Sequence, residues 1–330
     1  ALFVLMAYGQ EKKFALYSVA FYNMENLFDT IHDEGKNDYE YLPNGTNQWN
    51  TMKYKAKLKN MSEILSLLST DKLPMGPAII GVSEIENYRV LEDILKQPAL
   101  ADRGYQYVHY EGEDQRGVDC AFFYNPKLFE LTNSKLVPYV YINDTIHKTR
   151  GFLIASGNIA GEKMHFIVNH WPSRAAASPA RERAGEQVRA IKDSLLREDS
   201  AAKIVIMGDM NDDPMDKSMA VALGAKRKPA DVGPTDLYNP WWDTLKKGYG
   251  TLMYKGKWNL FDQIVFTGNL LGTDRSTLKF YKHEIFRRDF MFQKEGKYKG
   301  YPKRTQAGGV WLNGYSDHLP TIIYLIKEVK

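Results

Sequence analysis

Polar side chains that could bind a metal ion or a phosphate group follow apolar runs at several places in the sequence. The clearest case is KIVIMGDMNDDP, residues 203–214, in which an apolar run passes through Gly208 into Asp209, Asn211 and two further acids. Carboxylates at this density repel one another unless backbone amides, a basic side chain or a metal ion neutralise them. The segment is therefore a candidate site for a cation or a phosphorylated ligand.

Five other segments combine an apolar run with side chains of the same kind. They are VAFYNMEN, IIGVSEIEN, FIVNHWPSR, LFDQIVF and YSDHLP, and their polar residues are Asn23, Glu25, Glu84, His170, Arg174, Asp262, Asp317 and His318. Strand ends gathered along one edge of a sheet are rigid supports on which sandwiches and barrels place an active site. We therefore expect these segments to converge at one edge.

Each residue also has a simpler structural explanation when it is considered alone. Asn23 could be a turn residue, Asp209 a helix N-cap and His170 a hydrogen-bonded core histidine. The acidic cluster also begins like an EF-hand calcium loop, but Pro214 replaces the expected glycine and Ala220 the final glutamate. We exclude a calcium loop of that kind.

Together the residues meet the requirements for metal-assisted attack by water on a phosphate ester. Carboxylates hold a hard cation such as Mg²⁺, which neutralises the phosphate and stabilises the departing oxygen. A carboxylate or an imidazole activates the water, while amides and a protonated histidine donate to the developing phosphorane. His318 needs a second carboxylate to fix its tautomer, and Asp262 is the candidate.

Strand-like and helix-like segments alternate along the chain and would position these residues. Runs rich in Val, Ile, Phe and Tyr predict strands at 14–23, 77–84, 105–110, 117–124, 150–159, 163–170, 203–208, 259–268 and 321–329. Helical spacing predicts helices at 52–68, 90–97 and 179–197. The basic, aromatic segment 271–314 reads as one long loop, either functional or a solvated excursion. Without repeats or linkers, we expect a single domain over residues 13–330.

Composition and charge limit the classes of function. The chain has 330 residues, with 44 basic against 40 acidic residues and a net charge of +4. This balance neither requires nor excludes a nucleic-acid partner. Its single cysteine, Cys120, excludes an intramolecular disulfide and a thiolate metal site. No apolar run reaches about 18 residues, so we expect no stable membrane insertion.

The first ten residues, ALFVLMAYGQ, are apolar and uncharged. Residues 1–12 read as the remnant of a secretory signal peptide, or else as a cloning remnant or a first strand. The first interpretation places the protein outside the cytoplasm, in a periplasm or secreted, and the others leave it cytoplasmic.

The ordered motifs YNMEN, GVSEIEN, VNHWPSR, GDMND, FDQI and SDHLP resemble those of the endonuclease/exonuclease/phosphatase superfamily, which includes deoxyribonuclease I-like and exonuclease III-like phosphoesterases. The resemblance spans Asn23 to Pro320, and GDMND and SDHLP are its most specific parts. It implies an α/β fold, a four-layered sandwich of two mixed β-sheets packed face to face with helices outside and one cleft at the strand ends. Ser83 stands where many members have glutamine, so the contribution of that amide stays open.

The resemblance also implies how a metal ion and the phosphate would be held. Glu84 would be the principal metal ligand, Asp317 would face the metal, and Glu25 would lie near it or near a second ion. Asn23 would orient metal-bound water or the phosphate. The charge and position of Arg174 make it a further candidate for phosphate binding.

Catalytic roles at the matching positions follow from the same resemblance. Asp209 would polarise the attacking water, and Asn211 would contact the phosphate. His318, held by Asp262, would bind the scissile phosphate, and His170 would approach it from the opposite side. Whether Asp209 or the His318 and Asp262 pair is the general base stays open.

We expect a monomeric Mg²⁺- or Mn²⁺-dependent phosphoesterase, in the first place a phosphodiesterase or nuclease. The basic segments IFRRDF, residues 285–290, and KYKGYPKR, residues 297–304, could line a groove for nucleic acid. One alternative is a phosphomonoesterase or phospholipase C-like enzyme acting on a phosphorylated small molecule or lipid headgroup. The other is a non-catalytic module that binds phosphorylated ligands.

Overall fold

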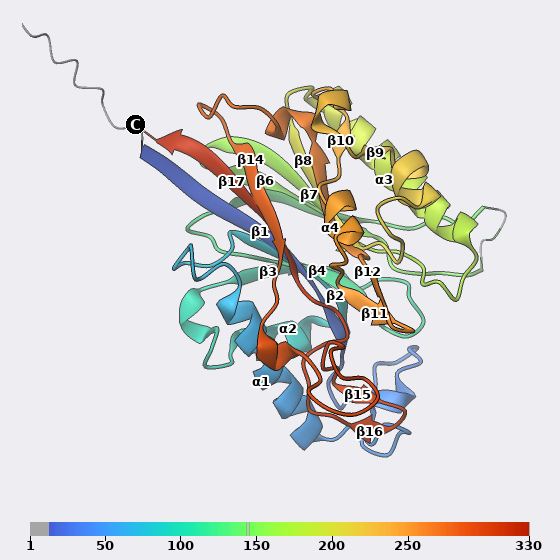
Figure 1. Ribbon diagram of the computed structural model, residues 1–330. Coiled ribbons are helices and arrows are strands. Elements are labelled where there is room, and N and C mark those ends of the chain that lie inside the picture. The colour runs from blue at the N-terminus through green and yellow to red at the C-terminus, as the bar shows by residue number, and fades with distance from the viewer. Residues whose placement is uncertain (1–12, 143, 145, 330) are drawn as a thin grey trace, which may run out of the picture.

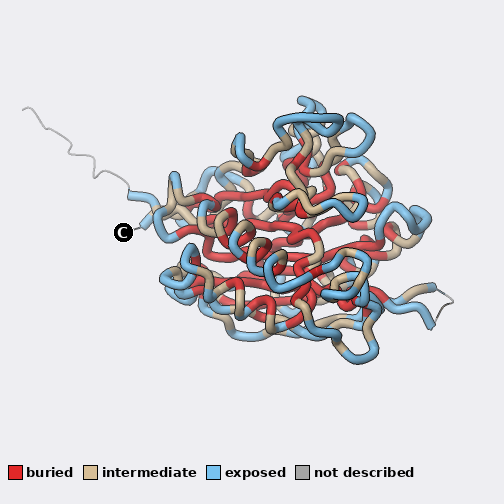
Figure 2. The backbone as a smooth tube through the Cα atoms, turned by 90° about the horizontal axis from the view of Figure 1, so that it is seen from below, coloured by how far each residue is buried: buried red, intermediate tan, exposed pale blue. Residues whose placement is uncertain are grey.

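Two β-sheets packed face to face, with helices on their outer sides, form the frame of the protein. The computed structural model describes residues 13–142, 144 and 146–329, so the predicted signal remnant at residues 1–12 lies outside the described residues. In Figure 1, α1 and α2 flank one sheet and α3 flanks the other. Figure 2 shows the buried backbone concentrated in the middle of the molecule. This arrangement confirms the four-layered sandwich.

The two sheets are both mixed. The six-stranded sheet has the order β14 (Lys279–Ile285), β17 (Thr321–Val329), β1 (Lys13–Leu27), β2 (Ile79–Ile85), β4 (Asp119–Tyr124), β3 (Gln106–His109). The seven-stranded sheet has the order β5 (Glu130–Val137), β6 (Phe152–Ile159), β7 (Glu162–His170), β8 (Lys203–Asp209), β13 (Asp262–Thr267), β10 (Leu237–Tyr238), β9 (Ala225–Lys226). Strands β1 and β2, like β7 and β8, run parallel, whereas β8 and β13 run antiparallel. Two hairpins lie outside the sheets, β11 (Leu252–Tyr254) with β12 (Lys257–Asn259) and β15 (Gln306–Ala307) with β16 (Val310–Trp311).

Two of the α-helices in the described chain begin with an asparagine cap. The α-helices of this part of the chain are α1 (Thr51–Leu67), α2 (Tyr88–Leu95), α3 (Ser178–Glu198) and α4 (Trp242–Lys246). The Asn50 side chain accepts a hydrogen bond from the backbone of Lys53, and Asn87 caps α2 in the same way. Such caps satisfy amides that the first helical turn leaves without partners. None of the described helices has the length and apolar character needed to cross a membrane.

Alternation along β1 explains how one strand contributes to two cores. Val19 and Phe21 face the second sheet, while Ala20 and Tyr22 face α1 and α2. Successive strand residues point to opposite faces, and both faces are covered here, so the run is apolar throughout. At Gly81 the sheets approach so closely that a Cβ atom would lie 2.6 Å from the Met207 sulfur. The core between the sheets therefore fixes the spacing of the strand ends.

The segment 271–314 is the clearest error of the sequence interpretation. It is not one loop, because β14 pairs with β17 at the edge of the first sheet and β15 and β16 form a hairpin. Strand β14, KFYKHEI, is rich in charged residues and only partly buried, as is common for an edge strand that must avoid pairing with other chains. The edge strand β5 escaped prediction for the same reason.

Candidate active site

Strand register brings the predicted residues to one edge of the sandwich. In the seven-stranded sheet, Asp209 lies opposite His170 on β7 and opposite Asp262 on β13. In the facing sheet, β1 and β2 carry Asn23 and Glu84 to the same edge, and β1 continues beyond Asn23 instead of ending there. The expected convergence of strand ends is confirmed at this edge.

The carboxylate of Asp209 is the centre of the cluster. Its Oδ2 atom accepts a hydrogen bond of 3.0 Å from Asn23 and lies 3.8 Å from Nε2 of both His170 and His318. Asn23 also donates to Glu84 Oε1 at 3.2 Å, and His170 Nε2 lies 3.7 Å from that oxygen. Two imidazoles and two carboxylates therefore surround one small volume.

His318 is held by a buried carboxylate, as the sequence predicted. Its Nδ1 lies 2.7 Å from Asp262 Oδ2, and Asp262 is fully buried. Burial alone would lower the pKa of His318, but the nearby carboxylates of Asp262 and Asp209 outweigh burial and raise this pKa well above its usual range. The surroundings of His318 therefore favour its protonated form, and its Nε2 lies on the side of Asp209.

His170 has the opposite character. Burial, reinforced by the Arg150 guanidinium, lowers the pKa of His170 well below its usual range. Arg150 itself is fixed by the Asp114 carboxylate and the Trp171 carbonyl. Nδ1 of His170 is buried and has no hydrogen-bond partner among the described residues. The pKa values of the two histidines are therefore shifted in opposite directions.

The backbone is strained where it presents these groups. Glu25, Asn26, Glu84 and Asn211 have φ angles of 45°, 51°, 58° and 52°, a region that side-chain-bearing residues rarely adopt. The Asn26 amide donates to Glu84 Oε2, and the Asn211 side chain donates to the Trp171 carbonyl. Such conformations cost about 1–3 kcal/mol each and gather at functional sites. Local sequence preference alone would not select them.

The donor atoms of the cluster suit a hard divalent cation. Glu84, His170 and Asp209 offer one ligand atom each within 4.8 Å of one another, as do Asp209, Asp262 and His318. Glu84 is the more accessible carboxylate, with 16% of its side chain exposed. Carboxylate and amide oxygens are the ligands that Mg²⁺ and Mn²⁺ prefer. Glu84 and Asp209 fit such an ion, while the Asn23 amide nitrogen donates to both carboxylates and its oxygen accepts the Glu25 backbone N–H.

Glu25 and Asp317 lie beside the cluster and are joined by a cation that the sequence analysis did not single out. Arg304 binds Glu25 Oε1 and Asp317 Oδ2, each at 2.8 Å. The other oxygen of Glu25 accepts the Thr305 amide at 2.7 Å and lies 3.9 Å from the buried ammonium group of Lys57. Burial and the charge of Asp317 raise the pKa of Glu25 to about 7. Protein donors therefore bind both oxygens of Glu25, and metal binding by Glu25 and Asp317 stays a prediction.

Arg174 lies in a separate cluster of carboxylates. Its guanidinium binds Asp216 at 2.9 Å and Asp213 at 3.3 Å, and it stacks over the Phe261 ring at 4.4 Å. Asp212 is buried and also contacts Arg174. Phosphate binding by Arg174 stays a prediction.

Two cavities adjoin the cluster on either side of Arg304. The larger, of about 770 Å³, lies between the β11–β12 hairpin and residues 293–302 and reaches Asp317. Tyr254, Tyr298 and Leu312 contribute to its largely apolar wall. The smaller, of about 220 Å³, lies beside Glu25. A substrate with its phosphate at the cluster could therefore extend in either direction.

Comparison with known proteins agrees with this arrangement. A model of the endonuclease/exonuclease/phosphatase family matches residues 18–327. None of the curated proteins compared with the chain matches it.

Three solved structures share the fold across nearly the whole chain. An endonuclease/exonuclease/phosphatase family protein from Bacteroides thetaiotaomicron is 14% identical, covers 97% of this chain and 98% of its own, and has a TM-score of 0.58. Mannosyl-6-phosphatase from the same organism is 14% identical, with coverage of 94% and 99% and a TM-score of 0.58. TDP2 from D. rerio, in complex with a single-strand DNA product, is 15% identical, with coverage of 94% and 99% and a TM-score of 0.55.

Proposed function

Because the chain belongs to the endonuclease/exonuclease/phosphatase family, we propose that it hydrolyses a phosphate ester with Mg²⁺ or Mn²⁺ as its cofactor. The observation that carries this proposal is the buried cluster in which Asp209 Oδ2 lies within 3.8 Å of Asn23, His170 and His318. A module that only binds its ligand has no need of a carboxylate placed between two imidazoles whose pKa values are shifted in opposite directions. The cluster therefore supports catalysis over simple binding.

Each residue of the cluster has a separate role in the proposed hydrolysis. A bound cation would neutralise the phosphate and stabilise the departing oxygen, with Glu84 as its main ligand. Burial raises the pKa of Asp209 to about 7, which suits a group that takes a proton from water near neutral pH. His318, kept protonated by Asp262, donates from Nε2 to a phosphate oxygen. Asn23 fixes the positions of Asp209 and Glu84 relative to each other.

Two arginines of the basic segments are engaged within the protein, which favours a phosphorylated small molecule over a nucleic acid. A groove that follows several phosphates needs basic side chains free to contact them. Arg287 instead lies over the rings of Trp258 and Phe292, at 4.8 and 4.9 Å, and Arg304 binds Asp317. The printed names of structural neighbours include both a sugar phosphatase and a protein bound to a DNA product, so the fold itself permits either class.

Ester cleavage by purified protein tests the proposal. We would compare p-nitrophenyl phosphate, bis(p-nitrophenyl) phosphate and plasmid DNA, with Mg²⁺ or Mn²⁺ and with EDTA. Asp209→Asn and His318→Gln should lower kcat by about 10²–10⁴-fold, the usual contribution of a positioned acid or base. Asp231→Asn, the same change at an exposed aspartate outside the cluster, is the matched control. Normal turnover in either cluster variant, or turnover unaffected by EDTA, would refute the proposal. Cleavage of plasmid DNA alone would instead support the nuclease hypothesis.

A further inference from the structure

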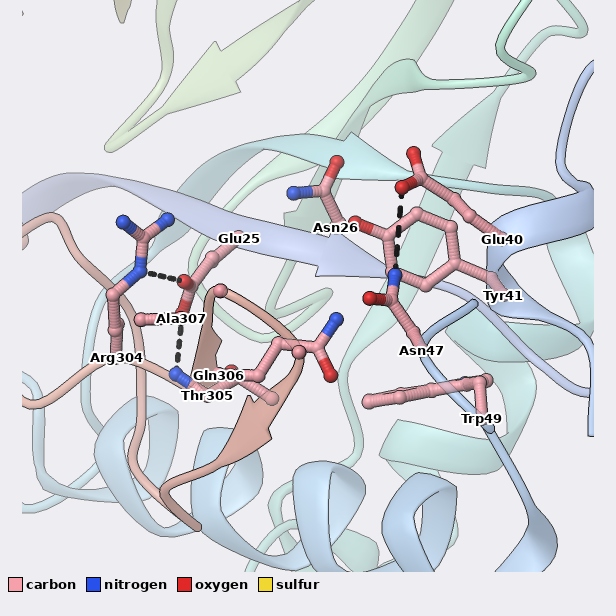
Figure 3. A pocket seen from close by; sticks show the side chains of 12 residues that line it. Glu25, Asn26, Glu40, Tyr41, Asn47, Trp49, Arg304, Thr305, Gln306 and Ala307 are labelled. Atoms are coloured by element: carbon pink, nitrogen blue, oxygen red, sulfur yellow. Dashed lines mark hydrogen bonds and ion pairs between the residues drawn. The ribbon is translucent and has the colours of Figure 1, made fainter. Parts of the chain in front are cut away.

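The smaller of the two cavities is a polar pocket next to the cluster, called the side pocket below. It lies between residues 39–49, which precede α1, and the β15–β16 hairpin. Its wall includes Asn26, Glu40, Tyr41, Asn47, Trp49 and Gln306, which surround one space in Figure 3. A volume of about 220 Å³ suits a single small ring better than a chain of several units.

The side pocket begins where the catalytic cluster ends. Asn26 follows Asn23 by three residues on β1, and its backbone amide binds Glu84 Oε2 at 3.0 Å. Arg304 forms part of the wall and also binds Asp317, the neighbour of His318. An ester whose phosphate lies at Asp209 and Glu84 can therefore place its alcohol portion in the side pocket.

The polar groups of the wall have unused hydrogen-bonding capacity. Oε1 of Gln306 is buried and has no hydrogen-bond partner among the described residues. Asn47 donates to Glu40 only at a long 3.5 Å. A buried polar atom without a partner is costly, and native structures usually satisfy it with a ligand, water or another group. In Figure 3 the Gln306 amide lies between Glu25 and Asn47, at the middle of the cavity.

The mixture of donors and acceptors selects the chemistry of the ligand. Carboxamides offer both N–H donors and carbonyl acceptors, and a carboxylate accepts, so the wall complements hydroxyl groups, which donate and accept. An acyl chain would leave Glu40, Asn47 and Gln306 unsatisfied. A second phosphate would meet the carboxylates of Glu40 and Glu25, while Arg304 is already bound to two acids. The aromatic rings of Tyr41 and Trp49 supply an apolar wall for the carbon face of a ring.

We propose that the side pocket binds a neutral, polyhydroxylated ring, a sugar or a cyclic polyol, that is esterified to the phosphate cleaved at the cluster. This inference rests on the proposed phosphoesterase function and specifies its substrate class. In the reaction the oxygen of water bonds to phosphorus and the ester P–O bond breaks. The ring leaves as an alcohol whose hydroxyl takes up a proton, and the phosphate keeps the oxygen of water.

Substrate selectivity tests the inference. The intact protein with Mg²⁺ or Mn²⁺ would be given hexose 6-phosphates, myo-inositol monophosphate, glycerol 3-phosphate and p-nitrophenyl phosphate. The kcat/KM for a ring phosphate should exceed that for glycerol 3-phosphate. The higher kcat/KM of either the hexose or the inositol ester then shows whether the ring is a sugar or a cyclic polyol. Preference for p-nitrophenyl phosphate and glycerol 3-phosphate over every ring phosphate would overturn it.

Substitutions in the wall of the side pocket test whether this pocket causes the substrate preference. Asn47→Leu and Gln306→Met should each lower the ratio of kcat/KM for the preferred ring phosphate to that for p-nitrophenyl phosphate by about tenfold, the effect of one hydrogen bond of average strength. Asn133→Leu, the same change at an exposed site on the edge strand β5, should leave the ratio unchanged. Two variants guard against a folding defect in one of them, and unchanged ratios in both would overturn the inference.

A binding measurement separates failure of the side pocket from failure of the proposed function. Saturation-transfer NMR would detect the free sugar or polyol against the intact protein, without any turnover. Cleavage of p-nitrophenyl phosphate without any ring binding would refute the side pocket and keep the phosphoesterase. Ring binding that Asn47→Leu abolishes, in a protein without phosphatase activity, would support the side pocket and refute the phosphoesterase.

Discussion

Lys57 on α1 is a buried cation whose replacement should loosen the segment that carries the β15–β16 hairpin. Its ammonium group is fully buried and donates to Thr305 Oγ1 at 2.5 Å and to the Tyr315 carbonyl at 2.6 Å. Glu25 lies 3.9 Å away. One side chain therefore joins α1 to both ends of a segment about 250 residues later in the chain. The change we consider is Lys57→Met, which keeps the length of the side chain and removes its charge.

The expected loss follows from these contacts. Hydrogen bonds to a charged group contribute about 1.5–3 kcal/mol each, and removing one partner of a buried ion pair costs about 3–5 kcal/mol. Three terms reduce the loss. Methionine fills most of the same volume, and Arg304 still neutralises Glu25. Burial also lowers the pKa of Lys57 to about 8, so part of its charge is already disfavoured. We expect Lys57→Met to lower the free energy of unfolding by about 2–4 kcal/mol.

Urea unfolding at pH 7 of Lys57→Met, Thr305→Val and the double variant measures this contribution. The two changes should couple by about 1 kcal/mol or more, because each removes the same hydrogen bond. Lys55→Met is the matched control, since Lys55 is exposed on the same helix and its replacement should change stability by no more than about 0.5 kcal/mol. Additive losses in the double variant, or equal losses at Lys55 and Lys57, would refute the reasoning.

Three further predictions concern pH, packing and metal. Burial lowers the pKa of His283 to about 4 from its ordinary 6.5. As the pH falls from 6.5 to 4, the unfolded chain therefore binds more protons than the folded protein, and the folded protein loses stability. In urea unfolding, the wild type should lose about 1–2 kcal/mol more than His283→Gln between pH 7 and pH 5. A Cβ atom at Gly208 would lie 2.3 Å from the Asn169 carbonyl oxygen, so Gly208→Ala should destabilise by at least about 1–3 kcal/mol in the same assay. Mg²⁺ or Mn²⁺ at one hundred times its dissociation constant should stabilise the protein by about 2.7 kcal/mol in a thermal melt, and Glu84→Gln should remove most of this effect.

The parts of the fold with a clear apolar pattern could be predicted from the sequence. Strands such as β1, β7 and β8 bury both faces and are continuous apolar runs, and α1 shows its buried face through Leu58, Met61 and Leu65. The convergence of the candidate site residues was also predictable, because each of them follows or precedes such a run. Register then decides which of them meet, as with Asp209 between His170 and Asp262.

Features that depend on contacts between distant loops could not be predicted. Lys57 is one of several lysines in a helix whose sequence is amphipathic. It is buried because Thr305 and Tyr315, which are distant in the sequence, pack over it. Arg304 ends the basic segment KYKGYPKR, which could have lined a groove for nucleic acid, yet its partners are Glu25 and Asp317. The segment preceding α1 and the β15–β16 hairpin form the side pocket by meeting across more than 250 residues, a contact with no local signature.

The balance of charge at this edge links the frame to the proposed chemistry. The linked carboxylates are Glu25, Glu84, Asp209, Asp262 and Asp317, and the cations that contact them are Lys57, Arg304 and His318. Five carboxylates face three cations in a largely buried set, and burial of unpaired charge is costly, as the pKa values of about 7 for Glu25 and Asp209 reflect. Lys57 and Arg304 bind on the side of Glu25, and His318 binds Asp262, so the deficit falls on Glu84 and Asp209. A divalent cation at that point would restore neutrality, and the substrate phosphate would then be attracted to the cation instead of being repelled by the acids.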